Sequence, residues 1–160
     1  MSGLTLRPAR SHDPAWSIEM HREWYGQEFG FTPDFGDAIA GRMDEFLTLR
    51  DSFKRFWIAE RGGRRVGSIA ISRRAKDTAF LNFVLVDPAC RRLGIAQTLM
   101  DAALGHAREH QIASVRLMTY SCLTGARRLY QRYGFKIVEA TKDVSVHGQV
   151  VDQEFWEKRL

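Results

Sequence analysis

Apolar residues in the first third of the chain recur with the period of helices. Trp16, Met20 and Trp24 are spaced four residues apart, which predicts the apolar face of a first helix. This helix is expected to begin with Asp13 as its N-cap and with proline next in the chain. A second helical series follows the start signal Thr32-Pro33-Asp34. Its apolar members are Phe35, Ile39, Met43, Phe46 and Leu47.

Beyond Phe53 the pattern becomes that of strands. A continuous apolar run over residues 78–86 predicts a strand that is buried on both faces and ended by Asp87-Pro88. Two segments around the turn at Gly62-Gly63 predict a hairpin before it. The expected strands cover residues 5–7, 54–60, 64–72, 78–86, 115–119, 136–144 and 149–159, and two further helices begin at Gly94 and Thr124. The predicted order is βααβββαβαββ.

The composition is that of one packed domain. The 160 residues are 44% hydrophobic and 11% aromatic, so we expect a globular core and a single domain over residues 1–160. No apolar run approaches the ~18 residues of a membrane span, and no long apolar leader is expected. Cys90 and Cys122 alone form no disulfide framework. These features predict a cytoplasmic protein without membrane association.

The net charge of +5 fits either nucleic acid or a small polyanionic ligand. Arginine pairs are dispersed along the chain, and neither a basic run nor the spacing of a helix-turn-helix or zinc finger is present. A nucleic-acid partner is therefore not expected. No group of His, Cys and Asp has the spacing of metal ligands, so no metal is expected either.

The segment Arg91-Arg92-Leu93-Gly94-Ile95-Ala96 lies between the central strand and an amphipathic helix. The first N–H groups of a helix have no acceptors within it, and they sit at the positive end of its dipole. Gly94 and Ala96 leave this backbone open to close approach, while Arg91 and Arg92 add guanidinium groups. The pattern predicts an anion site, and a pyrophosphate in particular.

This turn resembles the signature of the GCN5-related N-acetyltransferase (GNAT) superfamily, which reads Arg or Gln, two residues, Gly, one residue, then Gly or Ala. The matching positions are Arg91, Gly94 and Ala96. A second match is the segment Ala126-x-x-Leu129-Tyr130-x-x-x-Gly134-Phe135. The resemblance extends over Leu4 to Leu160. It includes the acetyltransferase domain fused to MarR-type regulators in some bacteria, on the segments Trp57-Ile58-Ala59-Glu60 and His147-Gly148 with Gln153 and Trp156.

The resemblance implies an α/β (α+β) fold, namely the GNAT fold. Its sheet is mixed, mostly antiparallel and twisted, with about seven strands, about four helices and a V-shaped cleft between strands 4 and 5. It also implies an acyltransferase that moves an acetyl group from acetyl-CoA to a primary amine of a small molecule or peptide. The amine attacks directly in a ternary complex, without an acyl-enzyme and without a metal. Coenzyme A is then the polyanionic ligand.

The resemblance also assigns roles to individual residues. The backbone of Arg91, Arg92, Leu93, Gly94, Ile95 and Ala96, with Gln97 adjoining, holds the pyrophosphate. Val84, Leu85 and Val86 bond to the pantetheine arm as to an added strand, provided that the sheet parts beside them. Tyr130 protonates the leaving thiolate. Leu123 departs from the family, because many relatives have an asparagine just before the fourth helix.

The general base is left open by the sequence. Many relatives place a glutamate on the fourth or fifth strand, but residues 78–86 and 115–119 contain no carboxylate. Tyr25 and Glu28, near the first helix, are candidates for the acceptor side. His147 has a suitable ordinary pKa. Deprotonation through ordered water, with no single base, is the other possibility.

Three further expectations follow. Without a carboxylate base, a non-catalytic module that senses acyl-CoA or binds a partner is the alternative function. A homodimer is expected by analogy with the family, with Phe155 and Trp156 as contact residues. Acidic side chains near the cleft entrance either attract a cationic amine or form ordinary solvated helix faces, and these are Glu19, Glu23, Glu28, Asp34 and Asp37.

Overall fold

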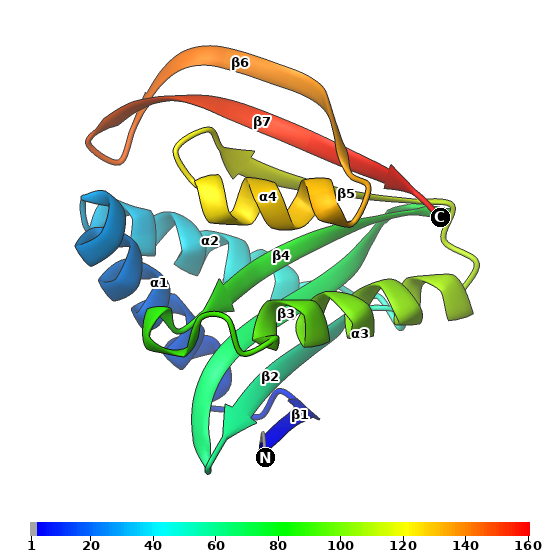
Figure 1. The fold of residues 1–160 in the computed structure, drawn as a ribbon. Coiled ribbons are helices and arrows are strands. Elements are labelled where there is room, and N and C mark those ends of the chain that lie inside the picture. The colour runs from blue at the N-terminus through cyan, green and yellow to red at the C-terminus, as the bar shows by residue number, and fades with distance from the viewer. Residues whose placement is uncertain (1–2) are drawn as a thin grey trace.

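The structure, a computed structural model, describes residues 3–160 and contains one seven-stranded sheet flanked by helices (Figure 1). The element order matches the predicted βααβββαβαββ, with an additional short 3-10 helix after the fourth strand. The strands are β1 (Leu4–Pro8), β2 (Arg55–Arg61), β3 (Arg64–Ala75), β4 (Thr78–Val86), β5 (Ser114–Tyr120), β6 (Lys136–Val146) and β7 (Gln149–Arg159). The helices are α1 (Asp13–Phe29), α2 (Asp34–Thr48), the 3-10 helix η1 (Pro88–Cys90), α3 (Ile95–Glu109) and α4 (Thr124–Arg132).

The sheet parts between β4 and β5, as predicted. Its strand order is β1-β2-β3-β4-β5-β7-β6, and only the β4–β5 pair is parallel. That pair is joined over three positions, from Thr78↔Ser114 to Phe80↔Arg116, although both strands continue well beyond. The remaining edges of β4 and β5 therefore face each other across a V-shaped cleft. The strand directions confirm the predicted fold, a mixed and mostly antiparallel sheet.

A β-bulge bends β4 beside this cleft. The β3–β4 register runs from Ser68↔Leu85 to Ala70↔Asn82, so that Phe83 and Val84 together face a single residue of β3. Phe83 has a φ of 56°, in the left-handed region that bulky residues rarely adopt. A bulge locally increases the twist of a strand and redirects its edge. It acts here just where β4 turns away from β5.

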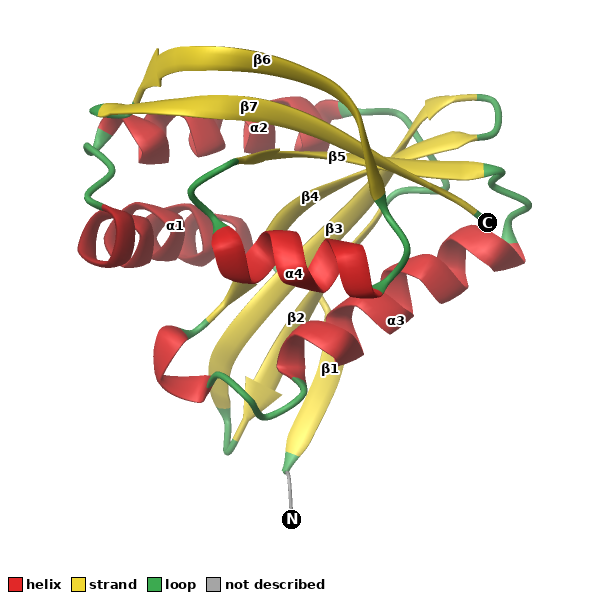
Figure 2. Cartoon of the chain, turned by 45° about the horizontal axis from the view of Figure 1, so that its top comes forward, coloured by secondary structure: helices red, strands yellow, loops and turns green. Residues whose placement is uncertain are grey.

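Helices cover both faces of the sheet (Figure 2). On one face, α3 and α4 enclose a core that includes Leu99, Met100 and Tyr130. On the other, α1 and α2 enclose a second core around Phe35, Met43 and neighbouring aromatic rings. The N-terminal end of α3 approaches the sheet closely, because a Cβ atom on Gly67 of β3 would lie 3.0 Å from Leu99 Cδ1 and 3.2 Å from Ile95 Cγ2.

The first helix differs from its prediction in two ways. Its N-cap is His12, and Asp13 is the first helical residue, whose carboxylate instead bonds to Arg7 and to the backbone N–H of Arg10. The face expected from Trp16, Met20 and Trp24 is only half-buried, and the fully buried residues are Asp13, Ser17 and His21. The most deeply buried face of α1 is therefore a polar one, and the predicted apolar face is only partly covered.

Two other apolar expectations are wrong. Leu47 continues the α2 periodicity but is 48% exposed at the end of the helix. Trp156, expected at a dimer contact, is 1% exposed and lies in the core beside Tyr130. Phe155 lines a cavity described below. Within residues 3–160, no helix is both long and apolar enough to cross a membrane.

Candidate functional site

Two cavities meet where the sheet parts. The turn cavity, of about 470 Å³, lies along the end of β4 and the start of α3. The α2 cavity, of about 460 Å³, lies between α1, α2 and the facing edges of β4 and β5. Four residues line both cavities, namely Tyr25, Val84, Leu123 and Ala126. A molecule filling the turn cavity and one filling the α2 cavity would therefore meet beside Val84.

The turn before α3 presents a row of uncommitted N–H groups. Arg92 has a φ of 66°, and Gly94, the N-cap, has a φ of 76°. The first helical bond of this region runs from the N–H of Thr98 to the carbonyl of Gly94. Among the described residues, no backbone acceptor is bonded to the N–H groups from Arg91 to Gln97. Such a concave row of donors at a helix N-terminus suits an anion.

Most residues assigned to the coenzyme lie together in the turn cavity. Its lining includes Val84, Leu85, Val86, Arg91, Arg92, Gly94, Ile95, Ala96 and Gln97. Leu93 is the exception, since its side chain is 45% exposed and outside the lining. This cavity is also lined by residues that the sequence did not predict for the coenzyme, namely Trp24, Cys90, Thr124, Gly125 and Arg128.

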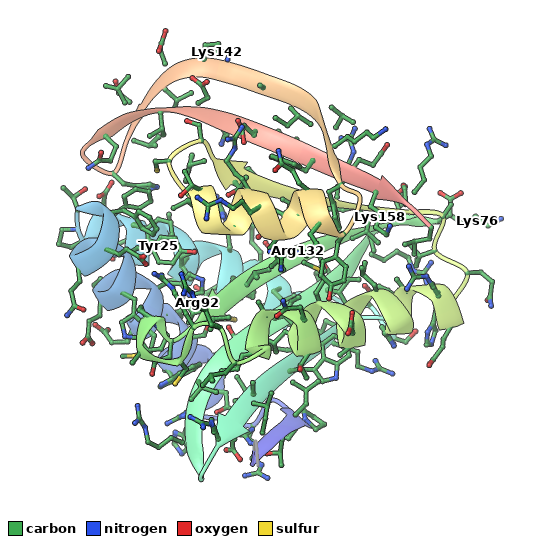
Figure 3. The ribbon with its side chains drawn as sticks, in the orientation of Figure 1. Tyr25, Lys76, Arg92, Arg132, Lys142 and Lys158 are labelled. Carbon is green, nitrogen blue, oxygen red and sulfur yellow. The ribbon has the colours of Figure 1, made fainter. Side chains whose placement is uncertain are left out.

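Glu28 lies in the turn cavity, although it was expected on the acceptor side. Its carboxylate forms an ion pair with Arg91, which joins the end of α1 to the turn. This hydrogen bond raises the pKa of the Arg91 guanidinium above its ordinary value. Figure 3 shows Tyr25 from α1 on the same side of the molecule as Arg92 from the turn. The entrance to the turn cavity thus carries two arginines, one of them paired.

Tyr130 is held rigidly on α4. It is 5% exposed, lines the α2 cavity and packs against the rings of Phe135 and Trp156. The N–H of Phe135 donates to the Tyr130 carbonyl at 3.0 Å, with Gly134 at a φ of 88°, as in a Schellman C-cap. Burial raises the pKa of the Tyr130 phenol above its ordinary value, so the phenol stays protonated at neutral pH.

Tyr25 and His21 form an aromatic wall of the α2 cavity. Their rings stack with centroids 5.6 Å apart, and Tyr25 also stacks on Phe35 at 4.7 Å. Burial, with a smaller contribution from the Glu28 charge, raises the pKa of Tyr25 to about 12. The Tyr25 phenol therefore remains neutral at physiological pH.

His21 was missed by the sequence analysis. Its Nδ1 lies 2.7 Å from the carbonyl oxygen of Ser17, which can only accept, so Nδ1 carries the hydrogen and Nε2 the lone pair. Nε2 has no hydrogen-bond partner within residues 3–160, while the ring lines the α2 cavity. Burial lowers the pKa of His21 to about 4. The lone pair of Nε2 is therefore available to a ligand in this cavity.

His147 is not brought into the cleft. It lines neither cavity, and its Nδ1 bonds to the carboxylate of Asp34 at 3.1 Å. Its ring packs against Phe31 and Phe35, and its carbonyl accepts the N–H of Thr32 at 3.0 Å. These contacts attach the β6–β7 turn to the loop between α1 and α2, so the structure gives His147 a packing role.

Carboxylates are sparse in the lining of the two cavities. Glu45 lines the α2 cavity, Glu28 lines the turn cavity, and neither stands on β4 or β5. The polar residue that β4 contributes to the α2 cavity is Asn82. The expectation that the fourth and fifth strands supply no carboxylate holds in the structure.

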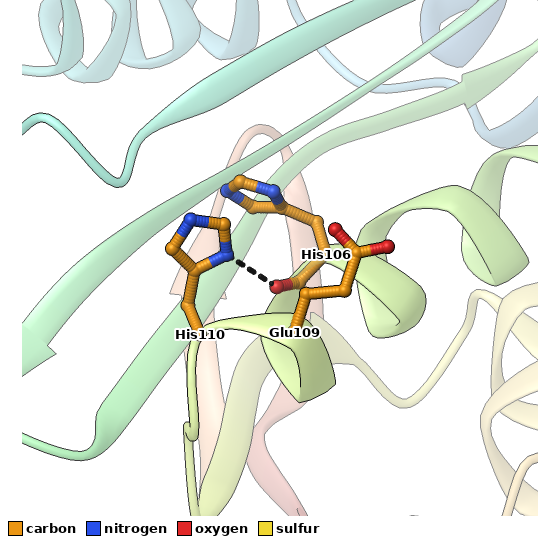
Figure 4. A group of neighbouring side chains, drawn as sticks. All are labelled: His106, Glu109 and His110. Atoms are coloured by element: carbon orange, nitrogen blue, oxygen red, sulfur yellow. Dashed lines mark hydrogen bonds between the residues drawn. The ribbon is translucent and has the colours of Figure 1, made fainter.

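One group of possible metal ligands lies away from the cleft, at the end of α3 (Figure 4). It comprises His106, Glu109 and His110. Each imidazole already has a protein partner, since His106 Nε2 bonds to the carbonyl of Phe53 at 2.7 Å and His110 Nδ1 to the carbonyl of His106 at 3.0 Å. None of the three lines either cavity, so the group takes no part in the site.

Comparison with curated proteins gives partial matches. The amino-acid acetyltransferase of Mycobacterium tuberculosis is 30% identical over 111 residues, which cover 66% of this chain and 61% of that protein. The N-acetylaspartate synthetase of Danio rerio is 33% identical over 94 residues, covering 58% of this chain and 33% of that protein. The chain thus spans only part of the length of these relatives.

Solved structures share the whole fold. An acetyltransferase of the GNAT family from Staphylococcus aureus has a TM-score of 0.77 and 21% identity, with 98% of both chains covered. A protein from Salmonella typhimurium, solved with its cofactor acetyl-CoA, also has a TM-score of 0.77, at 18% identity, covering 98% of this chain and 94% of that one. The family model for the acetyltransferase (GNAT) family matches residues 14–135, and the chain therefore belongs to that family.

Proposed function

We propose that this protein is an N-acetyltransferase that transfers the acetyl group of acetyl-CoA to a primary amine of a small molecule or peptide. The observation that carries the proposal is the meeting of two cavities at Val84, where β4 has parted from β5. One cavity presents the row of free N–H groups, and the other opens onto Tyr130 and His21. Donor and acceptor can then react directly, in a ternary complex.

The turn cavity has the chemistry that coenzyme A requires. Its N–H groups from Arg91 to Gln97 and the Arg92 guanidinium suit the pyrophosphate. The exposed edge of Val84, Leu85 and Val86 suits the amides of the pantetheine arm, which would lie along it like a strand. Arg128, at the opposite wall, adds a further cation for the phosphate groups.

Tyr130 and His21 serve the two proton transfers. The amine nitrogen forms a bond to the thioester carbonyl carbon, the carbon–sulfur bond breaks, and the phenol of Tyr130 gives its proton to the departing thiolate. The nitrogen of the new amide releases its remaining extra proton through water in the cavity, which restores the Tyr130 phenol. A phenol of raised pKa is protonated before the step and matches a desolvated thiolate. Nε2 of His21 accepts a hydrogen bond from the attacking amine and orients its lone pair. The proton of the ammonium passes to water in the α2 cavity, since no carboxylate stands on β4 or β5.

Three finer assignments belong to the same proposal. Residues 1–160 act as one catalytic domain, of the kind fused to MarR-type regulators in bacteria, and the protein works in the cytoplasm. The names of the two curated relatives indicate amino-acid acceptors for those proteins. They support an amine acceptor here, but each matched region covers only part of the relative.

The test is release of free thiol from acetyl-CoA in the presence of a broad panel of amines. Thiol release that depends on an amine, with the N-acetylated product identified by mass spectrometry, supports the proposal. The missing carboxylate base favours one alternative, a module that binds acyl-CoA without turnover. Tight binding of acetyl-CoA with no amine-dependent thiol release would establish that alternative and overturn the enzyme assignment.

A further inference from the structure

The end of the α2 cavity that lies away from the coenzyme turn is cationic. Arg42 of α2 and Arg73 and Arg74 of β3 line it, whereas Glu45 is the one carboxylate in the described lining. Counting formal charges, three guanidinium groups face one carboxylate. This is the reverse of the expectation that acidic side chains attract a cationic acceptor into the cleft.

Arg42 is the most informative of these residues. It is half-buried, yet no ion pair or hydrogen bond within residues 3–160 uses its guanidinium. Other half-buried arginines are paired, for example Arg7 with Asp13 at 2.7 Å and Arg127 with Glu154 at 2.9 Å. Desolvating a guanidinium without a counter-charge is costly, so an unpaired one in a cavity indicates a missing anion.

The charge of Arg42 acts close to the reaction point. After burial, its repulsion is a further cause that lowers the pKa of His21. The His21 ring stacks on Tyr25, and Tyr25 lines both cavities. An acceptor that contacts His21 with its amine therefore has the Arg42 cation within its electrostatic reach.

Arg73 and Arg74 extend the cationic wall toward the β3–β4 turn. The Arg74 guanidinium lies over the ring of Phe80 at 3.9 Å, and that of Arg73 lies over the ring of Phe53 at 5.0 Å. Neither arginine has an ion pair with a carboxylate in the described part of the chain. Stacking fixes their position while leaving their charge uncompensated.

We propose that the acceptor is an amine that also carries an anionic group, a carboxylate or a phosphate, and that Arg42 binds this group while the amine lies beside His21. This inference rests on the proposed function, because it names the substrate class of the same site. Arg73 and Arg74 contribute positive potential that attracts the acceptor and excludes polyamines and other purely cationic amines.

The test compares acceptors in pairs that differ only in the anionic group. Amino acids and ω-amino acids with spacers of increasing length are each assayed against their carboxamides, and phosphoethanolamine against ethanolamine. The carboxamide of an α-amino acid has the more readily deprotonated amine, so a preference for the acid is not an effect of amine pKa. We expect at least one anionic acceptor to exceed its neutral partner by about tenfold or more in kcat/KM.

Variants locate the preference. Arg42→Gln should remove it by lowering kcat/KM for the anionic acceptor to that of its neutral partner, and Glu45→Gln should strengthen it. The matched control is Arg108→Gln, which changes an exposed arginine on α3 outside both cavities and should have no effect. A preference that persists in Arg42→Gln would overturn the role of Arg42.

A binding measurement separates this inference from the proposed function. The N-acetylated anionic product and its carboxamide are titrated by calorimetry into the protein saturated with coenzyme A. Tighter binding of the anion, lost in Arg42→Gln, supports the anion site whether or not turnover occurs. Equal rates on acids and amides, together with equal binding of both products, would overturn the inference while leaving the acetyltransferase proposal intact. Failure to acetylate any amine would instead count against the proposed function.

Discussion

The hydroxyl of Ser68 on β3 donates a 2.6 Å hydrogen bond to the carbonyl oxygen of Phe83, the residue whose left-handed backbone forms the bulge of β4. Both residues are buried, and the Ser17 hydroxyl of α1 lies 3.2 Å from the Ser68 hydroxyl. The bulge displaces Val84, where the two cavities meet. A single buried hydroxyl thus supports the backbone geometry of the β4 edge that we propose for the coenzyme.

Ser68→Ala should weaken both the fold and the coenzyme site. The carbonyl of Phe83 would be left buried without its donor, at a cost of about 1–3 kcal/mol in the free energy of unfolding. We also expect a higher KM for acetyl-CoA, because β4 can relax from its bulge. Denaturant unfolding and steady-state kinetics measure the two effects. Ser114→Ala, in the part of β5 that remains paired with β4, is the control and should leave the KM unchanged.

Substitutions at two glycines, one in the turn before α3 and one inside α3, test the turn geometry and the helix stability separately. Gly94 has a φ of 76°, so Gly94→Ala forces a left-handed alanine into the turn, at about 1–2 kcal/mol. We expect the KM for acetyl-CoA to rise about tenfold. Gly105 lies inside α3, and a Cβ added there would meet no atom within 4 Å. Gly105→Ala should therefore stabilise the protein by about 0.5–1 kcal/mol without changing that KM. Equal KM values in both variants would disprove the role of the turn.

Tyr130→Phe tests the proton donor. The ring contacts remain, so the fold should hold, while kcat should fall about 100-fold or more. The KM for acetyl-CoA should change little, because the phenol acts only as the thiolate leaves. Tyr133→Phe is the matched control at the end of the same helix, since its hydroxyl bonds to Asp101 at 2.8 Å, outside both cavities. An unchanged kcat in Tyr130→Phe would remove this residue from the mechanism.

The geometry of the turn before α3 could be predicted because its features are local. A strand, a turn with Gly94 and a helix N-terminus follow one another in sequence, and free N–H groups are a property of any helix start. The parting of the sheet was predicted from the family resemblance alone, because the apolar run of β4 contains no residue that indicates a bulge at Phe83. The left-handed Phe83 is bonded through its carbonyl to the hydroxyl of Ser68, a contact between two strands that the apolar run does not reveal.

Tyr25 and Tyr130 of the α2 cavity were predicted, but His21 was not, because the buried face of α1 that carries it is placed by tertiary partners. Asp13, Ser17 and His21 recur every four residues in the sequence. The apolar series Trp16, Met20 and Trp24 has the same spacing, and apolar residues are the usual sign of a buried helix face. Burial of the polar series depends on Arg7, on Ser68 and on the aromatic wall. The position of His147 also depends on tertiary partners, since its ring bonds to Asp34 and packs against Phe35.

The ion pair between Glu28 and Arg91 should restrain coenzyme binding. The Glu28 carboxylate both occupies an Arg91 guanidinium and adds negative charge where we propose that the coenzyme phosphates bind. Glu28→Gln should therefore tighten acetyl-CoA binding about 2- to 10-fold, and raised salt should reduce the gain. Isothermal titration measures both. Glu157→Gln breaks a comparable pair with Arg116 outside the cavities and should not change affinity. Weaker binding in Glu28→Gln would show that Glu28 assists the coenzyme instead.

Acid should destabilise the fold through His21. Burial lowers its pKa from 6.5 to about 4, so between these values the unfolded chain binds a proton that the folded protein does not. Stability therefore falls as pH decreases from about 6.5 to about 4, by about 3 kcal/mol for this residue, and the loss is complete below the folded pKa.

Denaturant unfolding at a series of pH values tests this, with His21→Gln as the variant. The variant should lose most of the slope in this window. His106, whose pKa burial also lowers, keeps its own contribution in both proteins, so the difference isolates His21. His12→Gln changes an exposed histidine and should keep the full slope. Parallel curves for His21→Gln and the unaltered protein would mean that His21 takes up its proton in the folded state, and the neutral Nε2 assigned to the acceptor amine would then be wrong.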